Sequence, residues 1–162
     1  MRTLIALLAG GLACGSAAGQ SGIACTTSIS SGTLTFGNVV PAAPAGVSAL
    51  LGEFVVRCAN SDNASRNVRL RMAISAGGSG TAAQRQMSRA GSPTPLLYNL
   101  YEDAGYTVVW TASTGGRPDE VLSVPGRSTA ELRRQIFGRI PGSQTAVTVG
   151  LYSDALVAEV RY

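Results

Sequence analysis

The side chains that most often carry catalysis are sparse in this chain of 162 residues. It has no histidine, and its thirteen basic residues are all arginine. These absences exclude Ser-His, Cys-His and Ser-Lys nucleophile pairs and any imidazole metal ligand. The adjacent carboxylates Glu102-Asp103 and Asp119-Glu120 remain, but neighbours on a strand point to opposite faces and do not converge on one substrate. We therefore expect no enzyme, no catalytic residue, no metal site and no cofactor.

The cysteines offer structural chemistry instead. Cys14 lies in an N-terminal segment that we expect to be removed, which leaves the pair Cys25 and Cys58. In an exported chain an even pair indicates a disulfide, with two free buried thiols as the alternative. The bridge would close a loop of about 34 residues, for which chain entropy predicts about 3–4 kcal/mol of stabilisation.

Four aromatic residues fall within thirteen positions: Tyr98, Tyr101, Tyr106 and Trp110. They could form a platform for stacking sugars, or they could pack in a core. On a regular strand Tyr98 and Tyr101 face opposite ways, and aromatic residues on neighbouring strands usually pack across the sheet. Core packing is the favoured interpretation, and a carbohydrate-binding module remains an alternative.

The first nineteen residues have the order of a secretory signal. Met1-Arg2 is charged, Leu4–Ala13 is an apolar run of ten residues, and small residues follow. We expect cleavage after Ala18 or Gly19, which divides the chain into a signal peptide, 1–19, and one domain, 20–162. The apolar run is shorter than the roughly 20 residues of a membrane-spanning helix, so we expect no membrane span after cleavage.

A lipoprotein signal is a weaker alternative. It would make Cys14 the lipidated residue, but the position three residues earlier is Gly11 rather than a large aliphatic residue.

Composition fits a globular, non-nucleic-acid-binding domain. The chain is 45% hydrophobic and 14% charged, which separates it from disordered segments. Its arginines are scattered along the sequence, so no basic patch indicates nucleic-acid binding.

The elements that carry these residues have a period of two. The clearest example is Asn67–Ser75, where alternate positions are apolar. The closing stretch 155–162 alternates in the same way. Further predicted strands are Thr33–Phe36, Phe54–Cys58, Leu96–Tyr101, Tyr106–Trp110 and Ala146–Tyr152. Many short strands separated by Gly, Pro and Asn indicate an all-β sandwich or barrel.

One segment is ambiguous between strand and helix. Ser128-Thr-Ala-Glu131 has the form of a helix capping box, yet the segments on both sides read as strands. We predict a strand around Leu132–Ile140.

An ordered set of motifs resembles the spore coat protein U domain family. It covers the whole expected mature chain, and its most specific part is the ending Gly-x-Tyr-x-Asp followed by an alternating strand that stops at an aromatic residue. The matching residues are Cys25, Leu34, Phe36, Gly37, Cys58, Arg85, Met87, Tyr98, Tyr101, Asp103, Trp110, Gly150, Tyr152, Asp154 and Tyr162.

The resemblance implies an immunoglobulin-like β-sandwich that lacks one strand. Members of this family include secreted coat proteins and pilins of archaic chaperone–usher fimbriae. For a pilin, the implied partners are a periplasmic pilus chaperone, an outer-membrane usher and other pilus subunits. A strand from the chaperone, and later from a neighbouring subunit, would complete the fold by β-augmentation. The implied location is the periplasm in transit, then the cell surface.

The two ends of the chain fit an acceptor of strands better than a donor. The last alternating strand runs to Tyr162, so no later strand completes the fold, while only Gln20–Ala24 precede the first paired cysteine after cleavage. A donor strand needs about ten alternating residues. We therefore expect a structural or adhesive pilus subunit that accepts a strand, with a stand-alone secreted coat or matrix protein as the nearest alternative.

Overall fold

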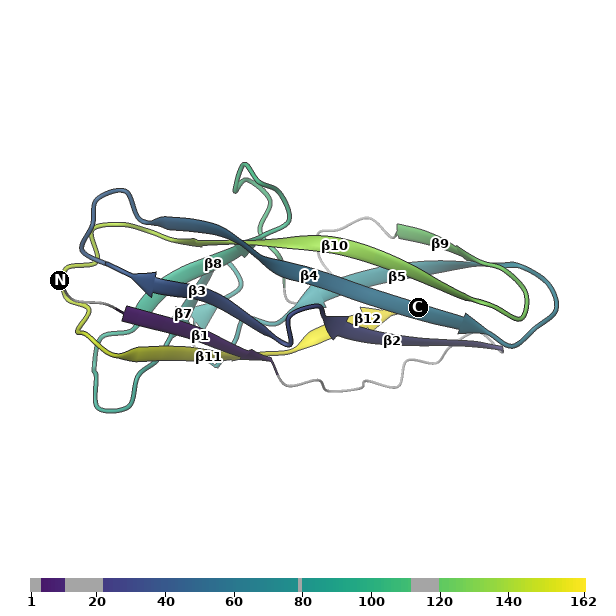
Figure 1. Ribbon diagram of the computed structural model, residues 1–162, viewed down its shortest axis with the longest axis horizontal. Coiled ribbons are helices and arrows are strands. Elements are labelled where there is room, and N and C mark those ends of the chain that lie inside the picture. The colour runs from purple at the N-terminus through teal and green to yellow at the C-terminus, as the bar shows by residue number, and fades with distance from the viewer. Residues whose placement is uncertain (1–3, 11–21, 79, 112–119) are drawn as a thin grey trace.

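The structure, a computed structural model, describes residues 4–10, 22–78, 80–111 and 120–162, and its regular elements there are all β-strands (Figure 1). The strands are β1 Leu4–Gly10, β2 Ile23–Ile29, β3 Thr33–Val39, β4 Val47–Asn60, β5 Arg66–Ile74, β6 Gly80–Thr81, β7 Gln84–Met87, β8 Leu96–Tyr101, β9 Glu120–Val124, β10 Thr129–Ile140, β11 Leu151–Leu156 and β12 Ala158–Arg161.

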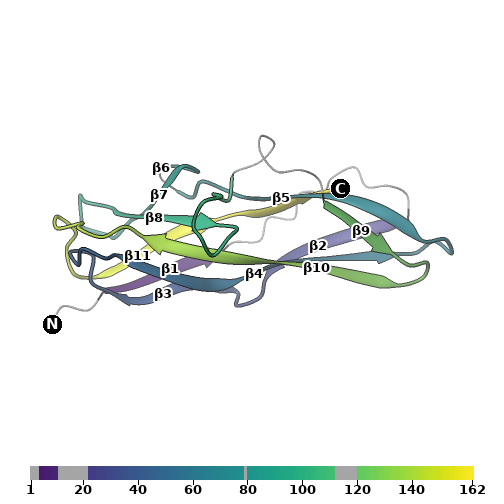
Figure 2. The same cartoon turned by 90° about the horizontal axis from the view of Figure 1, so that it is seen from above.

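Three sheets enclose one hydrophobic core. Their strand orders are β2-β4-β10-β8-β7-β6, β11-β1-β3 and β12-β5-β9. Buried residues from all three sheets form a single cluster that includes Phe54, Leu70, Tyr98 and Tyr152. Figures 1 and 2 show the strands running mostly along the long axis of an elongated molecule. The predicted all-β, immunoglobulin-like sandwich is confirmed.

The paired strands β4 and β10 are the longest elements. Their antiparallel register runs from Val47↔Ile140 to Ala59↔Thr129, with an irregularity between Ile136 and Phe137. The ambiguous segment is thus a strand, as predicted. The helix propensity of its first residues is overridden because β10 pairs with β4 on one side and with β8 on the other.

The period-two pattern located β5 and β8 well, but one predicted strand is absent and another begins later than predicted. Tyr106–Trp110 is not a strand. Asp103 accepts hydrogen bonds from the backbone amides of Thr107 and Val108, at 3.0 and 2.7 Å, and Tyr106 has a φ of 57°. These features make a turn, and the bridge between Tyr101 and Val109 connects it to β8.

The predicted strand Ala146–Tyr152 begins only at Leu151. The residues before it follow a turn that Gln144 holds against β8, since its side chain accepts from the amide of Leu97 at 2.8 Å and donates to the carbonyl of Leu97 at 3.1 Å.

The closing stretch divides between two sheets. β11 belongs to the sheet of β1 and β3, whereas β12 pairs with β5. The change occurs at Val157, whose amide donates to the side-chain oxygen of Ser75 and whose carbonyl accepts from the amide of Ser75, both at 2.9 Å.

The apolar N-terminal run also forms a strand. Leu4–Gly10, expected to belong to an export signal, is β1. The other predictions for this segment, which concern Cys14 and cleavage after Ala18 or Gly19, fall on residues outside the described ranges, as does Asp119.

Candidate functional site: a strand slot between β3 and β11

The backbone of β1 is hydrogen-bonded on both sides. It runs antiparallel to β3, from Leu4↔Val39 to Ala9↔Thr33, and parallel to β11, from Ile5↔Leu151 to Gly10↔Leu156. β3 and β11 are therefore one strand's width apart, and β1 lies between them in both views (Figures 1 and 2). We call the space between β3 and β11 the strand slot.

The far edge of β11 is held by Ser88. The amide of Ser88 donates to the carbonyl of Ser153, and the amide of Ser153 donates to the carbonyl of Ser88, both at 2.9 Å. Because backbone groups alternate in direction along a strand, the amide and carbonyl groups of Tyr152 and Asp154 face β1. These groups need a partner strand in the slot.

The inward side chains of β11 fix it to the core. Asp154 is 6% exposed, and its carboxylate accepts a hydrogen bond from the Tyr98 hydroxyl at 2.6 Å and another from the amide of Gly78 at 2.7 Å. Burial, together with the hydrogen bond to Asp154, raises the pKa of Tyr98 above its ordinary value. The hydroxyl of the buried Tyr152 lies 3.2 Å from those of Ser92 and Thr148. These contacts position β11 without help from β1.

A β-bulge shapes the other side of the slot. The pairing of β1 with β3 shifts between Ala6↔Gly37 and Leu7↔Thr35, so Phe36 is the extra residue. The bulge changes the alternation of β3, which lets Val39 as well as Phe36 reach the core. Gly37 has a φ of 66°, in the left-handed region that favours glycine. The bulge at Phe36 and the left-handed conformation of Gly37 therefore explain why these two residue types occur together in the motif.

An apolar hollow lies at one end of the slot. It has a volume of about 650 Å³ and is lined by Val40–Ala42 and Thr145–Val149. In the register of β1 it lies next to Leu4, which pairs with Val39. Val40, Val149 and Leu151 nearby are 52%, 41% and 56% exposed. No local sequence pattern predicts this hollow, because its two segments are far apart in the chain.

The buried Arg85 explains the Arg-Gln-Met motif of β7. Its guanidinium donates to the carbonyls of Ile74 at 2.9 Å and Trp110 at 2.7 Å, and to the side-chain oxygen of Asn99 at 2.7 Å. Burial lowers the pKa of Arg85. Because oxygen atoms inside the fold accept the hydrogen bonds of its guanidinium, Arg85 joins β5, β8 and the segment after β8.

The predicted disulfide is confirmed. Cys25 and Cys58 are bonded and lie opposite each other on β2 and β4, with their Cα atoms 4.0 Å apart. The bridge fixes the first half of β2 to β4, and β2 leads through a turn into β3, one side of the slot.

The remaining motif residues do not converge on a ligand. Tyr98 and Trp110 are each 1% exposed, and Trp110 stacks on Phe54 with ring centroids 5.7 Å apart. Tyr101 contacts Tyr106 edge-on at 5.5 Å. Tyr162 packs at the rim of the core, and a side chain on Gly150 would meet the side chain of Arg89.

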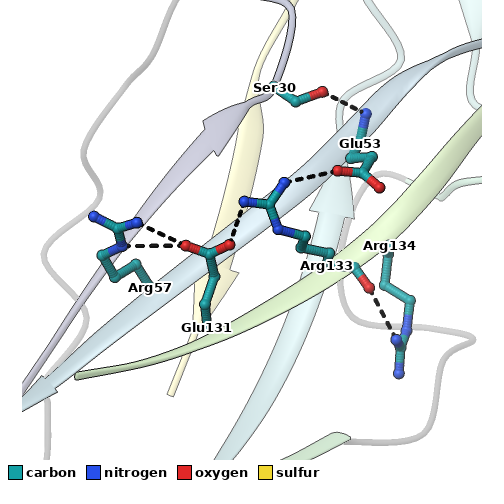
Figure 3. A network of polar contacts seen from close by, with 6 residues as sticks. All are labelled: Ser30, Glu53, Arg57, Glu131, Arg133 and Arg134. Atoms are coloured by element: carbon teal, nitrogen blue, oxygen red, sulfur yellow. Dashed lines mark hydrogen bonds and ion pairs between the residues drawn. The ribbon is translucent and has the colours of Figure 1, made fainter. Parts of the chain in front are cut away.

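A second polar feature covers the outer face of β4 and β10 (Figure 3). Glu131 pairs with Arg57 at 2.8 Å and Arg133 at 2.5 Å, and Arg133 also pairs with Glu53 at 2.9 Å. A groove of about 340 Å³ beside them is lined partly by hydroxyl residues of β2. The charges neutralise one another along the strands, so this face is a ladder of ion pairs rather than a catalytic site.

The described residues contain neither a metal-binding cluster nor a membrane-spanning helix. In ranges 4–10, 22–78, 80–111 and 120–162, no cluster of three or more His, Cys, Asp or Glu side chains could hold a metal ion. Within the same ranges, no helix is long and apolar enough to cross a membrane.

Comparison with known proteins identifies the family. No match is found among curated proteins. The family model of the Spore Coat Protein U domain matches residues 14–159. That match spans almost all of the described strands except β1, and it includes the motifs around the strand slot. The chain therefore belongs to the Spore Coat Protein U domain family, a family of coat and pilus-type proteins.

Proposed function

We propose that this chain is a structural or adhesive subunit of an archaic chaperone–usher pilus and that the strand slot accepts a donor strand. The observation that carries the proposal is the position of β1, which separates β3 from β11 and pairs with both. The family match begins at residue 14, so the strand that fills the slot lies outside the matched domain.

The physical need for a donor follows from expected export. If residues 1–19 are removed, β3 and β11 lose their common partner and become unpaired edges beside an apolar core. Added strands commonly satisfy such edges through main-chain hydrogen bonds, with alternate side chains filling the space below. The partner chemistry is therefore an extended, apolar segment, supplied by a periplasmic chaperone and then by another subunit.

The N-terminus of the expected mature chain suits a subunit that accepts a strand better than one that donates a strand. Only Gln20–Ala24 precede Cys25 in the expected mature chain, and Ile23 and Ala24 already pair with Asn60 and Ala59 as part of β2. The residues that a donor would need are thus committed to this subunit's own sheet. A place at the end of a fibre fits this arrangement.

Co-expression tests the proposal. The chain would be exported with and without a co-expressed periplasmic pilus chaperone, and soluble material would be quantified and sized. We expect a 1:1 complex with the chaperone and rapid degradation of the chain alone. A monomer that is equally abundant and stable without the chaperone would contradict the pilus proposal and favour a stand-alone coat protein.

A further inference from the structure

We propose that the chain's own N-terminal segment, Leu4–Gly10, is a placeholder strand that closes the strand slot until that segment is removed. The inference rests on the proposed function, because a placeholder matters only if the slot later takes a partner's strand. It assigns the apolar run a folding role in addition to the export role that its composition predicts.

The backbone pairing of β1 supports this assignment. β1 is the central strand of its sheet, with six aligned positions on β3 and six on β11. A segment that merely touched the surface would add to one edge only. Here both edges are satisfied together, and the seven residues of β1 cover β11 along its whole length.

The direction of β1 also fits a replaceable strand. It runs parallel to β11, and its first residues lie at the end of the slot where the apolar hollow opens. That hollow remains exposed beside Val40 and Val149 while β1 is in place. A competing strand can therefore contact the hollow before it displaces β1.

Cleavage changes the competition without first breaking any contact of β1. While the chain is intact, the slot and its placeholder are in one molecule, so their effective concentration is in the millimolar range or above. Hydrolysis of one peptide bond after Ala18 or Gly19 adds water across that bond and leaves β1 held only non-covalently. A partner's strand then competes on concentration and affinity, and displacement becomes favourable.

A cysteine cross-link tests the register directly. The full chain would be refolded under oxidising conditions with Cys14→Ser and the pair Ala9→Cys and Thr33→Cys, whose Cα atoms are aligned. The matched control is Ile5→Cys with Thr33→Cys, which the register keeps apart. Disulfides form only between Cα atoms within about 7 Å. We expect the aligned pair to give at least about tenfold more cross-link, and equal yields would overturn the proposal.

Hydrogen exchange gives a second measurement that does not depend on new cysteines. Leu7→Pro removes a donor from the centre of β1, whereas Ser16→Pro changes the same N-terminal segment outside β1. We expect amides of β3 and β11 to exchange at least about tenfold faster in the Leu7→Pro chain than in the Ser16→Pro chain. Equal protection in the two chains would also overturn the proposal.

The outcomes separate this inference from the proposed function. A chain whose slot is unaffected by Leu7→Pro, yet which still forms a 1:1 complex with the chaperone after export, would be an acceptor with no placeholder. A chain that gives the aligned cross-link but never binds a chaperone would have a self-filled slot and no pilus role.

Discussion

The hydrogen bond between Tyr98 and Asp154 links two of the three sheets that enclose the core. Tyr98 is in β8 and Asp154 is in β11, and both side chains are almost fully buried. Asp154 is also where the strand slot meets the core, since its backbone faces β1. One residue pair thus couples the shape of the slot to the rest of the fold.

Replacing Tyr98 with phenylalanine tests this coupling. Tyr98→Phe removes a hydrogen bond to a buried carboxylate and leaves Asp154 with one fewer donor, so we expect a loss of about 1–3 kcal/mol in the free energy of unfolding. Urea titration of the full chain measures it. Tyr106→Phe is the control, because it keeps a half-buried ring that contacts Tyr101 and Phe137 and removes only a hydroxyl; it should change stability by less than about 0.5 kcal/mol. Equal losses of stability in the two variants would mean that the buried hydrogen bond stabilises the fold no more than the Tyr106 hydroxyl does.

At the scale of elements, the ladder of ion pairs on β4 and β10 predicts a response to acid. The hydrogen bond from Arg57, followed by that from Arg133, holds the pKa of Glu131 below its ordinary value. A carboxyl whose pKa is lowered on folding stabilises the protein above its unfolded pKa of about 4.3 and loses that contribution as the pH falls through the lower folded value.

The Glu131→Gln variant isolates this contribution. We expect its melting temperature to fall less steeply than that of the unchanged chain as the pH drops below about 4.3. Glu159→Gln is the matched control, because Glu159 makes only a 3.8 Å contact with Arg161. If both variants keep the full pH dependence, the ladder does not contribute to acid sensitivity.

The apolar hollow beside the slot predicts a separable effect on partner binding. Val149 is 41% exposed and lines the hollow, so Val149→Ser should leave folding almost unchanged while removing apolar contact with an incoming strand. We expect about a fivefold weaker Kd for the chaperone, corresponding to about 1 kcal/mol. Titration calorimetry of the purified subunit–chaperone pair measures it.

The control for that experiment is Val121→Ser. Val121 is 61% exposed and lies on β9, in a different sheet from the slot. A similar loss of affinity in both variants would show that the hollow has no particular role in binding.

At the scale of the whole molecule, local patterns predicted strands well and their partners poorly. The alternation in Asn67–Ser75 located β5 because one face of that strand is buried. The disulfide followed from cysteine count and export. The closing stretch alternates evenly, however, and nothing local shows that it changes sheets at Val157, because that change depends on Ser75.

The slot itself was only partly predictable. The resemblance implied a missing strand, and Phe36, Tyr98, Tyr152 and Asp154 do surround the place where it is needed. The occupant was not predicted, since an apolar run after Met1-Arg2 has the composition of a leader whether or not it can also pair as a strand. The hollow could not be predicted at all, because its lining comes from segments brought together only by the fold.

The central claim is that β3 and β11 form a slot for a partner's strand, and hydrogen exchange on the exported subunit tests it most directly. The amides of β3 and β11 would be followed in the mature subunit, refolded after purification, with and without bound chaperone, and β9, an edge strand of another sheet, is the internal control. We predict that the chaperone slows exchange in β3 and β11 by at least about tenfold and leaves β9 unchanged. Protection that appears elsewhere, with β3 and β11 unaffected, would contradict the account.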